Sequence, residues 1–202
     1  MKLYTKPGAC SLSDHIVLEW TGAPFDVKVM TAPELKQPEY LAINPAGAVP
    51  ALVDGDWALT QNAAILNYLA ESYPEANLAG ASPMLRAETN RWLGFLNADV
   101  HPAFHPLFGT TAFLEDEAAI EKTKAVARKK LRTYFERADA QLEGRDWLTG
   151  TRSIADAYLY VTLRWAGKTG VDLTGLDNLA AFRARMEADE GVRRALATEG
   201  LA

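Results

Sequence analysis

The chain has 202 residues, of which 49% are hydrophobic and 23% charged, and its formal net charge is −5. This composition is typical of a globular protein with a substantial core, and the length allows one domain or two small ones. The apolar runs are short and interrupted by charges, so we expect a cytoplasmic protein with no signal peptide and no membrane partner. The net negative charge argues against a nucleic-acid partner, and we interpret the basic run Arg128–Arg132 as a solvated helix face.

Charge is divided unevenly along the chain. Residues 1–80 contain four Lys, no Arg and nine Asp or Glu, whereas residues 81–202 contain seventeen basic and seventeen acidic side chains. The change coincides with the segment Tyr73–Pro83, whose Pro, Gly and Ser residues are typical of a linker. We therefore predict a first domain at 1–78, a linker at 79–84 and a second domain at 85–202.

The first part alternates between strand and helix patterns. Lys2–Thr5 and Asp26–Met30 are predicted strands, and between them apolar residues recur at helical spacing from Leu12 to Trp20. Gly22 is suited to end that helix. The pattern predicts a βαβ unit.

A hairpin and a helix follow in the sequence. Pro50–Asp54 and Trp57–Thr60 flank Gly55 as two strands, and Ala64–Leu69 carries an apolar helix face. The order βαβ and then ββα is that of a thioredoxin-like domain, although order alone identifies a fold weakly.

The second part has helical patterns throughout. Apolar residues from Ile120 to Leu142 predict a long amphipathic helix, and Ser153–Asp156 has the pattern of a capping box. The apolar run Ala157–Trp165 then predicts a buried helix. The expected fold is thus an α/β domain followed by an all-helical domain.

Cys10 is the only cysteine, and it lies in Lys6–Ser13 between the first strand and the first helix. Its thiol is either a reactive group or a small buried hydrophobe. An unperturbed thiol with a pKa of about 8.5 is only about 3% thiolate at pH 7, and a helix dipole supplies too little stabilisation to lower that pKa by two units. Activation would require a hydrogen bond to the sulfur, from the backbone near Ser11 or from His101.

Two further segments suggest ligand contacts. In Asn44–Leu52, a cis Val49–Pro50 bond would turn the Val49 amide and carbonyl outward to pair with a peptide, whereas an ordinary trans proline would simply open an edge strand. In Leu59–Ile65, Gln61 and Asn62 stand at a helix start that suits a carboxylate, and the alternative is helix capping alone.

Together these motifs resemble the cytosolic glutathione transferases, and Lys6–Ser13 with His15 is similar to the bacterial beta class. The resemblance covers essentially the whole chain, including Asn44–Leu52 and the capping box. It implies a thioredoxin-like domain, an all-helical domain, a homodimer, and glutathione bound as co-substrate along the first domain.

The resemblance also implies roles for individual residues. Cys10 matches the cysteine that faces the glutathione sulfur, Val49 the residue whose backbone pairs with the cysteinyl unit, and His101 a histidine near that cysteine. Gln61 and Asn62 match the pair that holds the γ-glutamyl end. Cys10 and His101 are thus the expected catalytic residues, and the remaining candidates for substrate binding are Lys36, Pro50, Asp99, Phe104, His105, Phe108 and Trp165.

Several positions depart from the family pattern. Asn62 replaces a serine, Gly94 an asparagine and Pro102 a lysine, which places glutathione affinity in question. The pair His101 and His105 has no evident third ligand, so we expect no metal.

Three functions follow as hypotheses. The leading one is conjugation of glutathione to small, partly apolar electrophiles, a detoxification reaction. The alternatives are glutaredoxin-like thiol–disulfide exchange through Cys10, and a non-catalytic ligand-binding protein.

Overall fold

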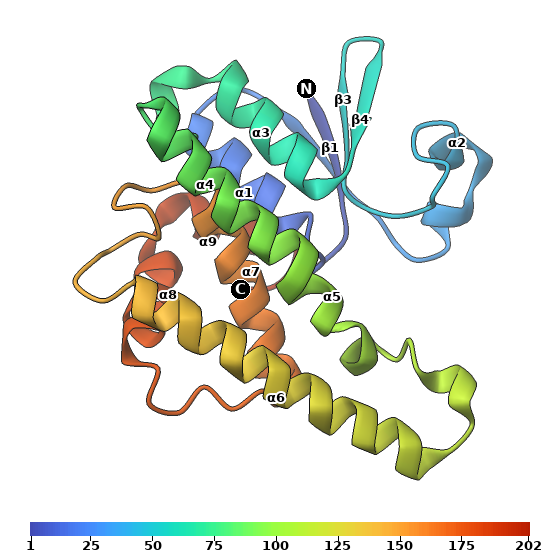
Figure 1. Ribbon diagram of the computed structural model, residues 1–202. Coiled ribbons are helices and arrows are strands. Elements are labelled where there is room, and N and C mark those ends of the chain that lie inside the picture. The colour runs from blue at the N-terminus through green and yellow to red at the C-terminus, as the bar shows by residue number, and fades with distance from the viewer.

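A computed structural model describes residues 1–202 and places a four-stranded sheet beside a bundle of helices (Figure 1). The strand order is β2-β1-β3-β4, in which β1 pairs parallel with β2 and antiparallel with β3. The chain order confirms the predicted βαβ and ββα units. The elements are β1 (Lys2–Thr5), α1 (Leu12–Thr21), β2 (Asp26–Val29), α2 (Pro38–Leu41), β3 (Ala51–Asp54), β4 (Trp57–Thr60) and α3 (Asn62–Ser72).

The two faces of the sheet are covered by different helices. Side chains alternate across a strand, so Leu3 packs into the main core with α1 and α3, while Tyr4 points the other way. Tyr4 meets Tyr40 of α2 with ring centroids 5.5 Å apart. In Figure 1 α1 and α3 accordingly lie on the side facing the helical bundle, and α2 lies beyond the opposite side.

The second part is helical throughout, as predicted. The expected helix at 120–142 is α6, and the expected buried helix is α7, which is nearly inaccessible to solvent along its first ten residues. The capping box is present, with the Asp156 carboxylate accepting from the Ser153 amide at 2.9 Å. The helices are α4 (Pro83–Phe95), α5 (His101–Ala103), α6 (Glu117–Gln141), α7 (Ile154–Thr169), α8 (Asp177–Ala188) and α9 (Glu190–Thr198).

One hydrophobic core runs through both parts of the chain. Helix α1 packs against α3 on one side and against α7 and α9 on the other, so apolar residues such as Leu12 and Ile16 belong to the same cluster as Tyr158. The turn that precedes α1 is therefore held by both the sheet and the helices. No helix has the length and apolar character needed to span a membrane.

The segment between α3 and α4 has the features of a connection. Ser82 caps α4 by accepting from the Leu85 amide at 3.2 Å. Gly80 has a φ of +101°, and a Cβ there would lie 2.9 Å from Leu85, so only glycine fits. The exact domain limits, 1–78 and 85–202, remain a prediction.

Candidate functional site

A cavity of about 330 Å³ opens where the first domain meets the helices. Its wall combines the turn before α1, the loop before β3, the start of α3 and the segment from α4 to α5. Seven of the residues expected at the site line it: Cys10, Val49, Pro50, Gln61, Asn62, His101 and His105.

A larger cavity, of about 570 Å³, lies between the end of α3 and the start of α4. The polar residues in its wall are Glu71, Asn77 and Arg86, and the other lining residues are small or apolar. It brings together no thiol or histidine. The smaller cavity is therefore the candidate site, because it gathers the groups capable of chemistry.

Cys10 lies in the turn before α1, and its Sγ donates to the Val49 carbonyl oxygen at 3.8 Å. Burial raises the pKa of the thiol to about 12, and the nearby Asp14 adds to the effect; a hydrogen bond from the Ser11 backbone lowers it only in part. The Ser11 donor considered in the sequence is thus present but insufficient. Cys10 is a neutral thiol at physiological pH.

The Val49–Pro50 peptide bond is cis, the less common of the two forms considered. The preceding Ala48 carbonyl is fixed from two sides, by the Tyr40 hydroxyl at 2.6 Å and the Asn44 side-chain amide at 2.7 Å. The Val49 amide makes no backbone hydrogen bond within the chain. An extended peptide in the cavity would therefore meet a free donor there.

The start of α3 forms the opposite wall. Gln61 has a φ of +77°, is exposed, and makes no side-chain capping bond. The first intrahelical bond of this end runs from the Ile65 amide to the Gln61 carbonyl, so the amides of Asn62, Ala63 and Ala64 have no backbone partner. Unpaired amides at a helix N-terminus attract anions.

The Asn62 side chain is buried and turned inward. With its nitrogen facing Asp14, the amide donates to Asp14 Oδ2 at 2.7 Å and to the Cys10 carbonyl at 3.1 Å, and its oxygen accepts from Ser13 Oγ at 3.2 Å. Every polar group of this side chain is used inside the protein. Asn62 therefore faces the cavity through its backbone.

His101 follows a π-helical turn, Leu96–Val100, and its Nδ1 lies 2.5 Å from the Tyr158 hydroxyl. Burial, together with the neighbouring His105, lowers the pKa of the His101 imidazole to about 4, and burial raises the pKa of Tyr158. The Tyr158 hydroxyl stays protonated and donates a hydrogen bond to Nδ1, because the buried hydroxyl would otherwise lack an acceptor. His101 is then neutral with its N–H at Nε2. No hydrogen bond joins it to Cys10.

The aromatic residues expected around the second substrate form a cluster with different exposures. Phe104 is fully buried, and it stacks on Phe108 with centroids 5.6 Å apart. Trp165 is nearly buried, and its Nε1 donates to the Gly8 carbonyl at 2.7 Å. Only Phe108, 47% exposed, presents a free aromatic face. None of the three lines the cavity, but Trp165 packs against His101, which does, with ring centroids 4.7 Å apart.

Five of the predicted residues do not line the cavity: Lys36, Asp99, Phe104, Phe108 and Trp165. Lys36 is exposed at the end of the short helical turn Glu34–Lys36, and Asp99 is exposed on the π-helical turn. Asn97 lines the cavity instead, along with Asn44, Thr60 and Pro102, which sequence reasoning did not assign to substrate binding. Asn97 precedes His101 by four residues, a spacing that places two side chains on one helix face and could have identified it.

Two family models match this sequence. The model of the glutathione S-transferase N-terminal domain matches residues 1–71, and that of the C-terminal domain matches residues 97–190. Glutathione S-transferase GST-4.5 of Xanthomonas campestris is 59% identical, with both chains covered completely. The chain belongs to the glutathione S-transferase family.

Solved glutathione S-transferases share the whole fold. The structure from Xylella fastidiosa has a TM-score of 0.97 and 57% identity, covering 100% of this chain and 99% of that one. A bacterial beta-class enzyme from Sphingomonas chungbukensis has a TM-score of 0.87 and 36% identity over the full length of both chains. The same coverage and TM-score, with 38% identity, hold for a sphingomonad glutathione S-transferase complexed with glutathione. The expected fold class and the beta-class resemblance are confirmed.

Proposed function

We propose that the 330 Å³ cavity binds glutathione and that its sulfur reacts there with a small, partly apolar electrophile. The protein is a glutathione S-transferase enzyme, and conjugation of glutathione to electrophiles is the reaction of its family. The observation that carries the assignment is that three groups suited to glutathione line the same cavity. A free peptide donor at Val49, an anion-binding helix start at α3 and a thiol at Cys10 face the same space.

Each part of the tripeptide has a matching partner. The cysteinyl unit would pair with the backbone of Val49, in the manner of an added strand. The γ-glutamyl carboxylate would meet the unpaired amides at the start of α3, with Gln61 adding an exposed side-chain amide. This arrangement would bring the glutathione sulfur beside Cys10. Lys36 and Asp99, which lie away from the cavity, stay predictions for substrate binding.

Cys10 acts in this proposal as a hydrogen-bond donor. Because its thiol stays protonated, its S–H can turn from the Val49 carbonyl to the glutathione sulfur and stabilise the thiolate form of glutathione. The glutathione thiol loses its proton to solvent. Its sulfur then forms a bond to the electrophilic carbon, and the leaving group departs with the electron pair of the bond that breaks.

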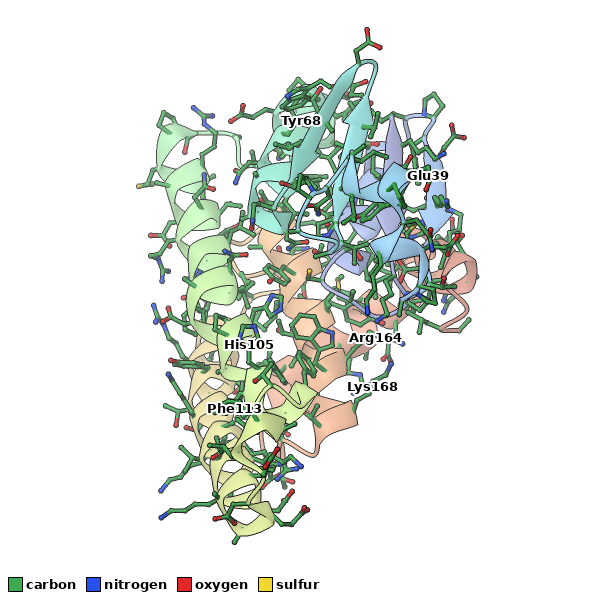
Figure 2. The ribbon with its side chains drawn as sticks, turned by 90° about the vertical axis from the view of Figure 1, so that its right-hand side faces the viewer. Glu39, Tyr68, His105, Phe113, Arg164 and Lys168 are labelled. Carbon is green, nitrogen blue, oxygen red and sulfur yellow. The ribbon has the colours of Figure 1, made fainter.

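The electrophile would lie between the glutathione sulfur and the helical domain. His105 lines this side of the cavity, and Phe108 offers its exposed ring beyond it. Figure 2 shows His105 nearer to the sheet than Phe113, which lies further along the helical bundle. The neutral His101 ring, with Nε2 as its N–H, is the polar donor on the same wall.

The neutral state of Cys10 also separates conjugation from thiol–disulfide exchange. Exchange through Cys10 needs its thiolate as the nucleophile, and burial disfavours that form. Conjugation needs only a donor beside the glutathione sulfur. The site therefore favours conjugation.

Three variants test the assignment. Calorimetry with glutathione should show binding by the wild type, and steady-state turnover with an aromatic halide should survive Cys10→Ser, which keeps a donor. Cys10→Ala should lower turnover about tenfold, since it removes one hydrogen bond to a charged sulfur. The matched control is Ser72→Ala, at the end of α3 away from the cavity. No binding of glutathione at millimolar concentration, or loss of all turnover in Cys10→Ser, would reject this role.

We also infer a homodimer that works in the cytoplasm, on the strength of the family resemblance. Trp57 of β4 and Met84 of α4 are 48% and 74% exposed, and large apolar side chains of this kind are common at subunit contacts. Light scattering after size exclusion measures the mass of the particle. A mass of one chain at micromolar concentration would refute the dimer.

A further inference from the structure

Asp14 is a buried carboxyl group that the proposed reaction does not use. It lies in the first turn of α1, with none of its surface exposed. Its Oδ1 makes no hydrogen bond, and its Oδ2 lies 2.7 Å from the Asn62 amide nitrogen. Burying a carboxyl group with so few partners is costly, so its presence needs a reason beyond packing.

The groups around Asp14 do not neutralise it. Cys10 precedes it in the turn, His15 follows it on α1, Tyr158 faces it from α7, and Glu199 approaches from the segment after α9. None of these donates a hydrogen bond to its carboxylate. Burial and the negative charge of Glu199 raise the pKa of Asp14 well above its usual value.

Asn62 links Asp14 to the cavity. It is the first residue of α3, and its side chain contacts Asp14, Ser13 and the Cys10 carbonyl at once. Two ends of the candidate site therefore meet at one amide: the Cys10 turn and the unpaired amides of α3. A change in this side chain would move one end relative to the other.

We propose that Asp14 is a positioning residue of the glutathione site, which holds the Asn62 amide and so locks the start of α3 against the Cys10 turn. The inference rests on the proposed function, since it assumes that glutathione spans these two ends. Asp14 lies behind the wall and touches no ligand. Asp14 acts by fixing the distance between the sulfur and carboxylate subsites. A small error in that distance is enough to weaken the binding of glutathione.

This role differs in measurable ways from that of a residue that merely fills the core. A packing residue would affect the melting temperature and leave the affinity of the folded protein unchanged. A positioning residue changes the Kd of glutathione in protein that is still folded. It also loses its effect once Asn62 is gone, because Asp14 acts only through that side chain.

The test is a double-mutant cycle on the full chain, with the Kd of glutathione measured by calorimetry and folding followed by thermal melting. Asp14→Ala and Asn62→Ala should each weaken binding about tenfold, and the double variant should be no weaker than Asn62→Ala. Asp14→Asn should bind within about twofold of wild type, because its amide oxygen still accepts from Asn62. Should Asp14→Ala fail to fold, Asp14→Leu takes its place, since it fills the space and buries no charge.

Thr89→Val is the matched control. Thr89 also has a buried oxygen without a hydrogen bond, and it lies on α4 away from the cavity. Its substitution should leave the Kd unchanged. Wild-type affinity in Asp14→Ala or Asp14→Leu, or independent losses that multiply in the double variant, would overturn the role of Asp14. Failure of wild-type protein to bind glutathione would instead reject the proposed function.

Discussion

Alkylation by iodoacetamide measures the protonation state of Cys10 directly, because the chain has no other cysteine. The reagent attacks the thiolate and not the thiol. The structure raises the pKa of Cys10 from an ordinary 9.0 to about 12, chiefly by burial and next by the charge of Asp14. We predict slow alkylation at neutral pH.

The magnitude combines two opposing effects. A pKa three units higher leaves about a thousandfold less thiolate at a given neutral pH. A more basic thiolate is intrinsically more nucleophilic, and with a Brønsted slope of about 0.4 to 0.5 this recovers about 1.2 to 1.5 of the three powers of ten. The net expectation is a rate about 30 to 60 times lower than that of an exposed thiol, before any effect of restricted access.

The assay follows the rate from pH 6.5 to pH 10 in the absence of glutathione, by mass spectrometry. The rate should rise about tenfold for each pH unit with no plateau in this range. Unfolding in urea should restore the rate of an ordinary thiol, which is the internal control. In Asp14→Asn the folded protein should react faster, because one cause of the raised pKa is removed. A plateau below pH 9 would contradict the raised pKa, and a plateau below pH 7 would mean that Cys10 is a thiolate at neutral pH and would refute the donor role.

The remaining predictions concern the supports of the site. The imidazole of His101 should titrate near pH 4 by NMR. Because the unfolded chain binds that proton below about pH 6.5, the stability of the protein should rise with pH between about 4 and 6.5. His101→Asn should flatten this slope, and an unchanged slope would contradict a buried neutral ring. Trp165→Phe removes the donor to the Gly8 carbonyl and should cost about 1 kcal/mol in urea unfolding, with a fall in kcat/KM; full activity would show that this link does not hold the Cys10 turn. Glu199→Ala should cost about 3 kcal/mol, because it leaves the Gly8 amide and the buried His15 imidazole without their carboxylate partner and the Thr5 hydroxyl with Ser11 alone. A loss below about 0.5 kcal/mol would mean that these groups pair elsewhere.

Features written in short stretches of sequence were predictable. The turn that carries Cys10 and the helix start at Gln61 each depend on a few adjacent residues, and the structure has both. The sequence left the Val49–Pro50 bond open between cis and trans, and the structure has the cis form. The helical second part was equally accessible, because the apolar spacing of α6 and the capping box of α7 are local patterns.

The direction and exposure of side chains were not predictable in the same way. The sequence suggested that Asn62 would offer its amide to the ligand, but the contacts of Asn62 with Asp14 and Ser13 come from packing α1 against α3. Burial of Phe104 behind Phe108 likewise depends on α6 and α7. The raised pKa of Cys10 also arises from burial by this packing, and the helix-dipole argument made from the sequence could not predict it.

The carboxylate of Glu199 has a consequence for the order in which the enzyme is assembled. It receives the hydroxyl of Thr5, 194 positions earlier, and the Gly8 amide in the turn before α1. The ribosome makes the chain from its amino end, so the sheet domain can begin to fold long before Glu199 has left the exit tunnel. During that interval the turn that carries Cys10 lacks the hydrogen bond between the Gly8 amide and Glu199. A nascent chain therefore completes its active site only late in its synthesis, and until its packing is complete Cys10 has the reactivity of an ordinary thiol.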